Sequence, residues 1–130
     1  MAATDKILII DDDARNIFAL TATLKAAGYR SMAAGSAIQG LAFLKNDPAI
    51  SIILLDMMMP EMDGYEAIGK LKDIRNVYII AVTAQAMTGD RERCLAAGAD
   101  EYVSKPINVD KLFRLIDTHI NAHSGDTDNG

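Results

Sequence analysis

Residues 52–56 read Ile-Ile-Leu-Leu-Asp, and residues 57–60, Met-Met-Met-Pro, follow them directly. A short, continuous apolar run bounded by turn residues is typical of a strand buried on both faces of a parallel sheet. The carboxylate of Asp56 therefore emerges at the carboxyl edge of that sheet, where open α/β folds place their ligands. This stretch predicts both the fold class and the position of a functional site.

A second apolar run, residues 7–10, also ends in acids, which are Asp11, Asp12 and Asp13. Two buried strands thus deliver several carboxylates to one edge of the sheet. Like charges brought together are costly unless a cation joins them. We therefore expect a metal site at this edge.

Strand-like runs recur at residues 6–10, 29–33, 51–55, 77–82 and 101–104, and a helical segment separates each from the next. This alternation indicates a parallel sheet with helices on both faces. The fourth helical segment, about residues 87–97, has its apolar stripe interrupted by charged residues. We expect that helix to pack shallowly and to move more easily than the others.

The composition fits one globular domain. The chain has 130 residues, of which 50% are hydrophobic and 24% are charged, and its net charge is −5. This charge disfavours nucleic acid as a direct partner. No apolar stretch approaches the ~20 residues that span a bilayer, so we expect no membrane segment and a cytoplasmic location. Cys94 is the single cysteine, which excludes an intrachain disulfide.

Four pieces of the sequence together match a known family. They are residues 7–12 with their acidic pair, Asp56 with residues 57–64 (MMMPEMDG), residues 82–84 (VTA) and residues 102–106 (YVSKP). From residue 6 to about 122 the chain resembles the receiver domain of two-component response regulators. The resemblance implies a five-stranded parallel sheet of order 2-1-3-4-5 with five helices on both faces, a flavodoxin-like three-layer sandwich. We expect residues 1–122 to form this receiver domain and residues 123–130 to be a disordered tail or linker remnant.

The resemblance implies that Asp56 is a phosphoacceptor, because a carboxylate can attack a phosphoryl group and form an acyl phosphate. Asp11 and Asp12 would hold Mg²⁺, directly or through water, together with Asp56 and the backbone carbonyl of Met58. Magnesium prefers oxygen ligands and sits against phosphate oxygens. The acids of residues 11–13 could instead cap the next helix, but only one of them can do so, and Asp13 is the natural choice.

Two further side chains would contact the phosphoryl group. Lys105 offers a cation for one phosphate oxygen, and the Thr83 hydroxyl offers a donor for another. The resemblance implies that the bond from Lys105 to Pro106 is cis, which would aim the ammonium group at Asp56. It also implies a switch in which Thr83 moves toward the phosphate and Tyr102 fills the space that Thr83 leaves.

The partners follow from the same resemblance. The phosphodonor would be the phosphohistidine of a sensor histidine kinase or of a histidine phosphotransfer protein. A downstream protein effector would bind the face formed by the fourth helix, the last strand and the last helix, where Leu115 lies off the inward stripe. The sequence fits equally a stand-alone receiver and a receiver from a hybrid kinase or larger regulator.

The second of the three successive methionines, Met58, stands where a polar residue is more usual. A thioether cannot orient an attacking water by hydrogen bonding, so we expect slow loss of phosphate. Gln85, two residues after Thr83, could partly compensate.

Two other functions are possible for a chain with these motifs. A magnesium-dependent phosphatase that works through an aspartyl phosphate usually carries a second acid two residues after the nucleophile, and Met58 occupies that place. A flavin-binding electron carrier of the same strand order would need a phosphate-cradling loop rich in Gly, Ser or Thr after the first strand, and this chain has Asp11–Asp13 there. Receiver activity is therefore the first choice, and the phosphatase is the alternative.

Overall fold

The computed structural model describes the backbone of residues 5–84 and 88–129 and the side chains of residues 5–84 and 88–122. Strands and helices alternate along the described chain. The strands are β1 (Lys6–Ile10), β2 (Arg30–Ala34), β3 (Ile50–Asp56), β4 (Tyr78–Thr83) and β5 (Glu101–Ser104). The helices are α1 (Ala14–Ala26), α2 (Ala37–Asn46), α3 (Gly64–Ile74), α4 (Asp90–Ala97) and α5 (Val109–Asn129).

The five strands form one sheet in the order β2-β1-β3-β4-β5, and every neighbouring pair is parallel. The expected fold class and strand order are therefore confirmed. β1 and β3 lie in the middle of the sheet and are apolar along nearly their whole length, as strands covered on both faces must be.

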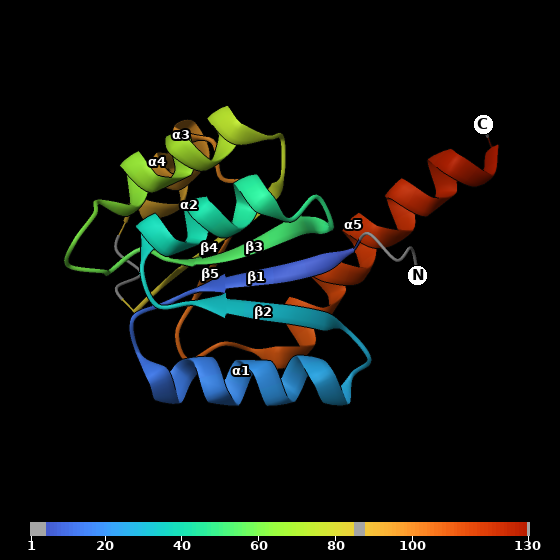
Figure 1. Cartoon of the computed structure of the whole chain (residues 1–130), viewed down its shortest axis with the longest axis horizontal. Coiled ribbons are helices and arrows are strands. Elements are labelled where there is room, and N and C mark those ends of the chain that lie inside the picture. Colours follow the sequence, from blue (N-terminus) through green and yellow to red (C-terminus); the bar gives the residue numbers. More distant parts are fainter. Residues whose placement is uncertain (1–4, 85–87, 130) are drawn as a thin grey trace.

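The sheet is the middle layer of three (Figure 1). α2, α3 and α4 cover one face, where their buried side chains pack with alternate residues of the strands, such as Leu8 and Ile53. α1 and α5 cover the other face and pack on the intervening residues, such as Ile9 and Leu54. Successive residues of a strand point to opposite faces, so one apolar run serves both cores.

Side chains cap the starts of α1 and α2. Asp13 caps α1 by accepting a hydrogen bond from the backbone N–H of Arg15 at 3.0 Å. Ser36 caps α2 by accepting from the N–H of Gln39 at 3.1 Å. Asp13 is thus the capping acid among residues 11–13, which leaves Asp11 and Asp12 for another role.

The last helix differs from expectation, because α5 continues as helical backbone to Asn129, whereas residues 123–130 were expected to form a tail or linker. Figure 1 shows the end of α5 extending beyond the sheet. Within the described part of the chain, no helix is both long enough and apolar enough to cross a membrane.

Candidate functional site

The strand register brings the expected site residues to one edge of the sheet. Ile10 pairs with Leu55, so Asp11 and Asp56 follow on neighbouring strands. Asp56 in turn pairs with Val82, which places Thr83 one residue further along β4. Thr83 pairs with Ser104, and Lys105 follows it. Each functional side chain thus stands at or just past a strand end, because the apolar residues before it are paired within the sheet.

Three carboxylates converge at this edge. One oxygen from each of Asp11, Asp12 and Asp56 can be chosen so that all three lie within 4.8 Å of one another. Asp11 and Asp56 are buried, with 3% and 5% of their surface exposed, while Asp12 is exposed. Two buried acids and one open to solvent form a cluster that an ion can reach from outside.

Hydrogen bonds fix the orientation of the two buried carboxylates. Asp11 accepts from the backbone N–H of Asp13 at 2.9 Å and from the side-chain amide of Asn16 at 2.9 Å. Asp56 accepts from the N–H of Met58 at 3.0 Å. Asn16 is not predicted from the sequence, because it lies on the first turn of α1 and belongs to no motif that would mark it.

Lys105 supplies the positive charge of the site. Its ammonium nitrogen lies 3.8 Å from Asp11 Oδ2 and 3.9 Å from Asp56 Oδ2. The peptide bond between Lys105 and Pro106 is cis. A single ammonium group thus faces two buried carboxylates at distances longer than a direct hydrogen bond, so it is not bound tightly to either of them.

The surroundings of Asp56 oppose its ionisation. Burial raises the pKa of the Asp56 carboxyl above its ordinary value, and the neighbouring Asp11 carboxylate raises it further. The hydrogen bond from Met58 and the charge of Lys105 act in the opposite direction without cancelling this effect. A carboxylate in this position gains from a cation bound beside it.

The donor set suits a hard divalent cation. It consists of carboxylate oxygens with one exposed member, and magnesium binds through a few carboxylates while it keeps several waters. Burial, and after it the nearby Asp11 carboxylate, raises the pKa of Asp56, so a cation bound here would favour the ionised form of this carboxyl. These acids therefore fit Mg²⁺.

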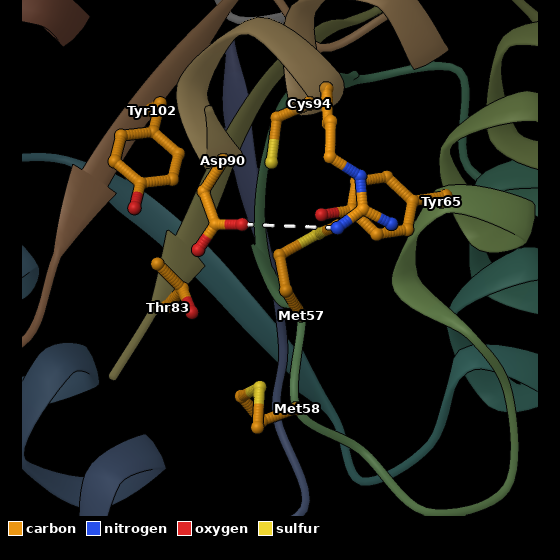
Figure 2. A pocket seen from close by; sticks show the side chains of 8 residues that line it. Met57, Met58, Tyr65, Thr83, Asp90, Cys94 and Tyr102 are labelled. Atoms are coloured by element: carbon orange, nitrogen blue, oxygen red, sulfur yellow. Dashed lines mark ion pairs between the residues drawn. The ribbon is translucent and has the colours of Figure 1, made fainter. Parts of the chain in front are cut away.

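A pocket of about 210 Å³ lies beside the acid cluster, between α3, α4 and the ends of β4 and β5. Thr83 and Tyr102, the residues of the expected switch, both line it, and so does Met58. Figure 2 shows these side chains together with Tyr65, Asp90 and Cys94 around the same space.

Three further residues were singled out in the sequence: Met58, Leu115 and Gln85. The side chain of Met58 is 50% exposed and lies beside the acid cluster, as its position after Asp56 implied. Leu115 is half-buried and packs against the core between the sheet and α1 and α5, so it offers less apolar surface than expected. Gln85 lies outside the described residues.

An open parallel sheet with clustered carboxylates and a lysine at its carboxyl edge defines a class of α/β proteins that bind a cation and an anionic group there. Comparison with known proteins narrows the class. Residues 7–117 match the family described as response regulator receiver domain, and the chain belongs to that family of signalling domains in two-component systems. Phosphorylation of an aspartate and binding of Mg²⁺ are general features of this family.

Known receiver proteins are similar to this chain over nearly its whole length. The polar-differentiation response regulator DivK of Brucella ovis is 33% identical over 120 residues, which cover 90% of this chain and 97% of DivK. The CheY-like receiver domain protein of Methanospirillum hungatei is 31% identical and superposes with a TM-score of 0.85 over 94% of this chain and 98% of its own. The receiver domain of the sensor histidine kinase PA1611 of Pseudomonas aeruginosa, solved with magnesium in its active-site cleft, is 34% identical, with a TM-score of 0.77 over 87% of this chain and 94% of its own.

Proposed function

We propose that this chain takes a phosphoryl group onto Asp56 from a phosphohistidine, in a reaction that requires Mg²⁺. The observation that carries the proposal is the buried Asp56 carboxylate, with two more acids within 4.8 Å and the Lys105 ammonium at 3.9 Å. The magnesium in the related PA1611 receiver supports the same ion here. Asp11, Asp12, Asp56 and the backbone carbonyl of Met58 would hold it.

In the proposed transfer, a carboxylate oxygen of Asp56 forms a bond to phosphorus as the bond from phosphorus to the donor imidazole nitrogen breaks. The bonding electrons leave with the imidazole, and an acyl phosphate remains on Asp56. Bound Mg²⁺ would neutralise charge on the phosphoryl oxygens. Lys105 would contact one of these oxygens and the Thr83 hydroxyl another, because both end neighbouring strands beside Asp56.

The phosphodonor in this proposal is a sensor histidine kinase or a histidine phosphotransfer protein, and we place the encounter in the cytoplasm. The relation to the PA1611 receiver, which is part of a sensor histidine kinase, supports such a donor. The alternative of a magnesium-dependent phosphatase gains no support, because the residue two positions after Asp56 is a half-exposed methionine that cannot act as an acid.

Acetyl phosphate, a small phosphodonor, tests the phosphoacceptor directly. With Mg²⁺ present, mass spectrometry should locate one added phosphoryl group on Asp56, and chelation of the metal should prevent the reaction. Asp56→Asn should remain unmodified, whereas Asp73→Asn, which changes an exposed acid of α3 outside the cluster, should react like the wild type. Equal modification of Asp56→Asn would refute the proposal.

The effector would bind the face formed by α4, β5 and α5, with Thr83 and Tyr102 as the switch. Both switch residues line the pocket next to Asp56, and this supports a path from the phosphoryl group to β5. Tyr102→Ala and Leu115→Ala should each weaken phosphorylation-dependent binding of the effector about 5- to 10-fold. Phe18→Ala, on the 77% exposed apolar side chain of α1, is the matched control that should leave it unchanged. Wild-type binding by both face variants would exclude this face.

A further inference from the structure

The pocket beside Asp56 contains polar groups that phosphoacceptor chemistry does not use. Besides the switch residues Thr83 and Tyr102, it is lined by Tyr65, Asp90, Arg93 and Cys94. Met57 and Met58, which directly follow the phosphoacceptor, complete the wall. The wall of this pocket thus begins with the residue that directly follows Asp56.

The hydroxyl of Tyr102 is buried and has no hydrogen-bond partner among the described residues. Leaving a buried hydroxyl unpaired costs about 1–3 kcal/mol. Tyr102 therefore gains stability from any rearrangement of the pocket that brings an acceptor within reach of its hydroxyl.

The polar groups of the pocket differ in their capacity to accept that hydrogen bond. The Tyr65 hydroxyl donates to the sulfur of Cys94, and a guanidinium such as that of Arg93 has no acceptor at all. In the proposed phosphorylated state, the Thr83 hydroxyl donates its hydrogen bond to a phosphoryl oxygen. Asp90 alone among these lining residues carries an ionised acceptor, and a carboxylate can accept about four hydrogen bonds.

The position of Asp90 suits this role. It is the first residue of α4, after Gly89 with φ of 90°, and its side chain is only 18% exposed. Figure 2 shows its carboxylate directed into the pocket, on the same side as Thr83 and Tyr102. Arg93 holds it there, with Nη1 at 4.0 Å from Asp90 Oδ1, while the same guanidinium lies 4.7 Å above the Tyr65 ring.

The charge of Asp90 already acts on its neighbours in the pocket. After burial, it is the largest of the causes that raise the pKa of Tyr102, and it also raises the pKa values of Cys94 and Tyr65. A nearby carboxylate stabilises the neutral phenol of Tyr102, which is the form that donates a hydrogen bond.

We propose that Asp90 accepts a hydrogen bond from the Tyr102 hydroxyl when Asp56 is phosphorylated, and that this bond couples the start of α4 to the switch. The inference rests on the proposed function. Movement of Thr83 toward the phosphoryl group frees the space in which the hydroxyl and the carboxylate meet. Asp90 is thus a positioning residue that ties α4 to β5 in the phosphorylated state and makes no contact with the reacting atoms.

A double-mutant cycle on Asp90→Ala and Tyr102→Phe tests the bond, with beryllium fluoride plus Mg²⁺ as the probe that mimics the phosphoryl group. Each single variant should bind beryllium fluoride about 5- to 10-fold more weakly than the wild type, since a net hydrogen bond is worth about 1 kcal/mol. The double variant should bind no more weakly than the weaker single variant. Additive losses, or wild-type binding by Asp90→Ala, would overturn the inference.

Three controls separate this role from a merely structural one. Asp110→Ala removes an acid from the first turn of α5, outside the pocket, and should leave beryllium fluoride binding unchanged. Asp90→Asn keeps a side-chain acceptor and should recover most of the affinity that Asp90→Ala loses. If Asp90→Ala does not fold, Asp90→Leu, which also lacks an acceptor, takes its place in the cycle with Tyr102→Phe. Affinity for Mg²⁺ alone should change less than about 2-fold in all variants. If the wild type itself fails to bind beryllium fluoride, the proposed function fails, and additivity with intact binding refutes only the role of Asp90.

Discussion

At the scale of single residues, the environment of each side chain decides its chemistry. Asp11, Asp12 and Asp13 are chemically identical, yet Asp13 caps a helix, Asp11 is held by two hydrogen bonds beside Asp56, and Asp12 is open to solvent. Only the last two can serve an ion at the cluster. The difference arises from the turn after β1, which directs three successive side chains to three different surroundings.

We expect Met58 to prolong the lifetime of the proposed acyl phosphate. Its half-exposed thioether stands beside the acid cluster and offers no hydrogen bond to an attacking water. Met58→Asn should accelerate the loss of phosphate from the purified phosphoprotein about 10-fold, which corresponds to one added hydrogen bond of about 1.4 kcal/mol in the transition state. Met58→Leu, which is equally unable to bond water, should hydrolyse at the wild-type rate. An unchanged rate in the Asn variant would show that this side chain does not limit hydrolysis.

At the scale of elements, α4 is the helix with the least anchoring. Its eight residues include one buried side chain, that of Cys94, whereas α3 buries Gly64, Ala67, Ile68 and Leu71. Few buried apolar contacts permit local opening at low free energy. Amide hydrogens of α4 should therefore exchange at least 10-fold faster than those of α3, as measured by hydrogen exchange with mass spectrometry or NMR. Equal protection of the two helices would contradict the shallow packing that the sequence predicts.

The end of α4 depends on a glycine. Gly98 has φ of 119°, and a Cβ atom there would lie 3.2 Å from Ile68 Cγ2. Gly98→Ala should therefore lower the free energy of unfolding by about 1–2 kcal/mol in urea denaturation. Gly69, within α3, is the matched control, because a Cβ there meets nothing within 4 Å. Gly69→Ala should raise stability by about 0.5–1 kcal/mol, and a loss at both positions would refute the argument from backbone conformation.

At the scale of the whole molecule, sequence patterns predicted the strands and the residues at their ends. They did not predict the pocket beside Asp56 or the length of α5. Apolar runs followed by Asp11, Asp56 or Thr83 located the ends of the three inner strands, because burial on both faces demands uninterrupted apolar residues. The sheet register then brought those residues together. An apolar run shows which residues of a segment are buried, but it does not show which residues of another helix or strand they contact.

The pocket beside Asp56 was missed for that reason. From the sequence alone, Asp90 and Arg93 are only interruptions of the apolar stripe of α4. Tyr65 and Tyr102, which line the pocket with them, come from α3 and β5 and are distant along the chain. The length of α5 was missed for another reason. Residues 123–129 lack apolar side chains, so packing gave no signal, but a helix that is already nucleated extends at little cost.

The acid cluster also affects the stability of the whole protein, and the sign follows from the raised pKa of Asp56. The folded protein holds the Asp56 proton more tightly than the unfolded chain does. The stabilising effect of that proton is complete below the ordinary aspartate pKa and is lost as the pH rises through the raised pKa of the folded state. At neutral pH, in metal-free buffer, an ionised Asp56 is therefore a net cost to folding.

Asp56→Asn should remove that cost. In metal-free buffer at neutral pH it should raise the free energy of unfolding by on the order of 1 kcal/mol, measured by urea denaturation, and this advantage should shrink toward acid pH. With Mg²⁺ present, the wild type should become more stable than the variant. An ion bound only by the folded protein stabilises it by about 1.4 kcal/mol at ten times its dissociation constant, and the variant binds the ion more weakly because it has lost one ligand charge. Asp73→Asn, at an exposed site of α3, should show neither effect. A variant less stable than the wild type in metal-free buffer would mean that Asp56 is held by compensating contacts and that the cluster does not need a cation.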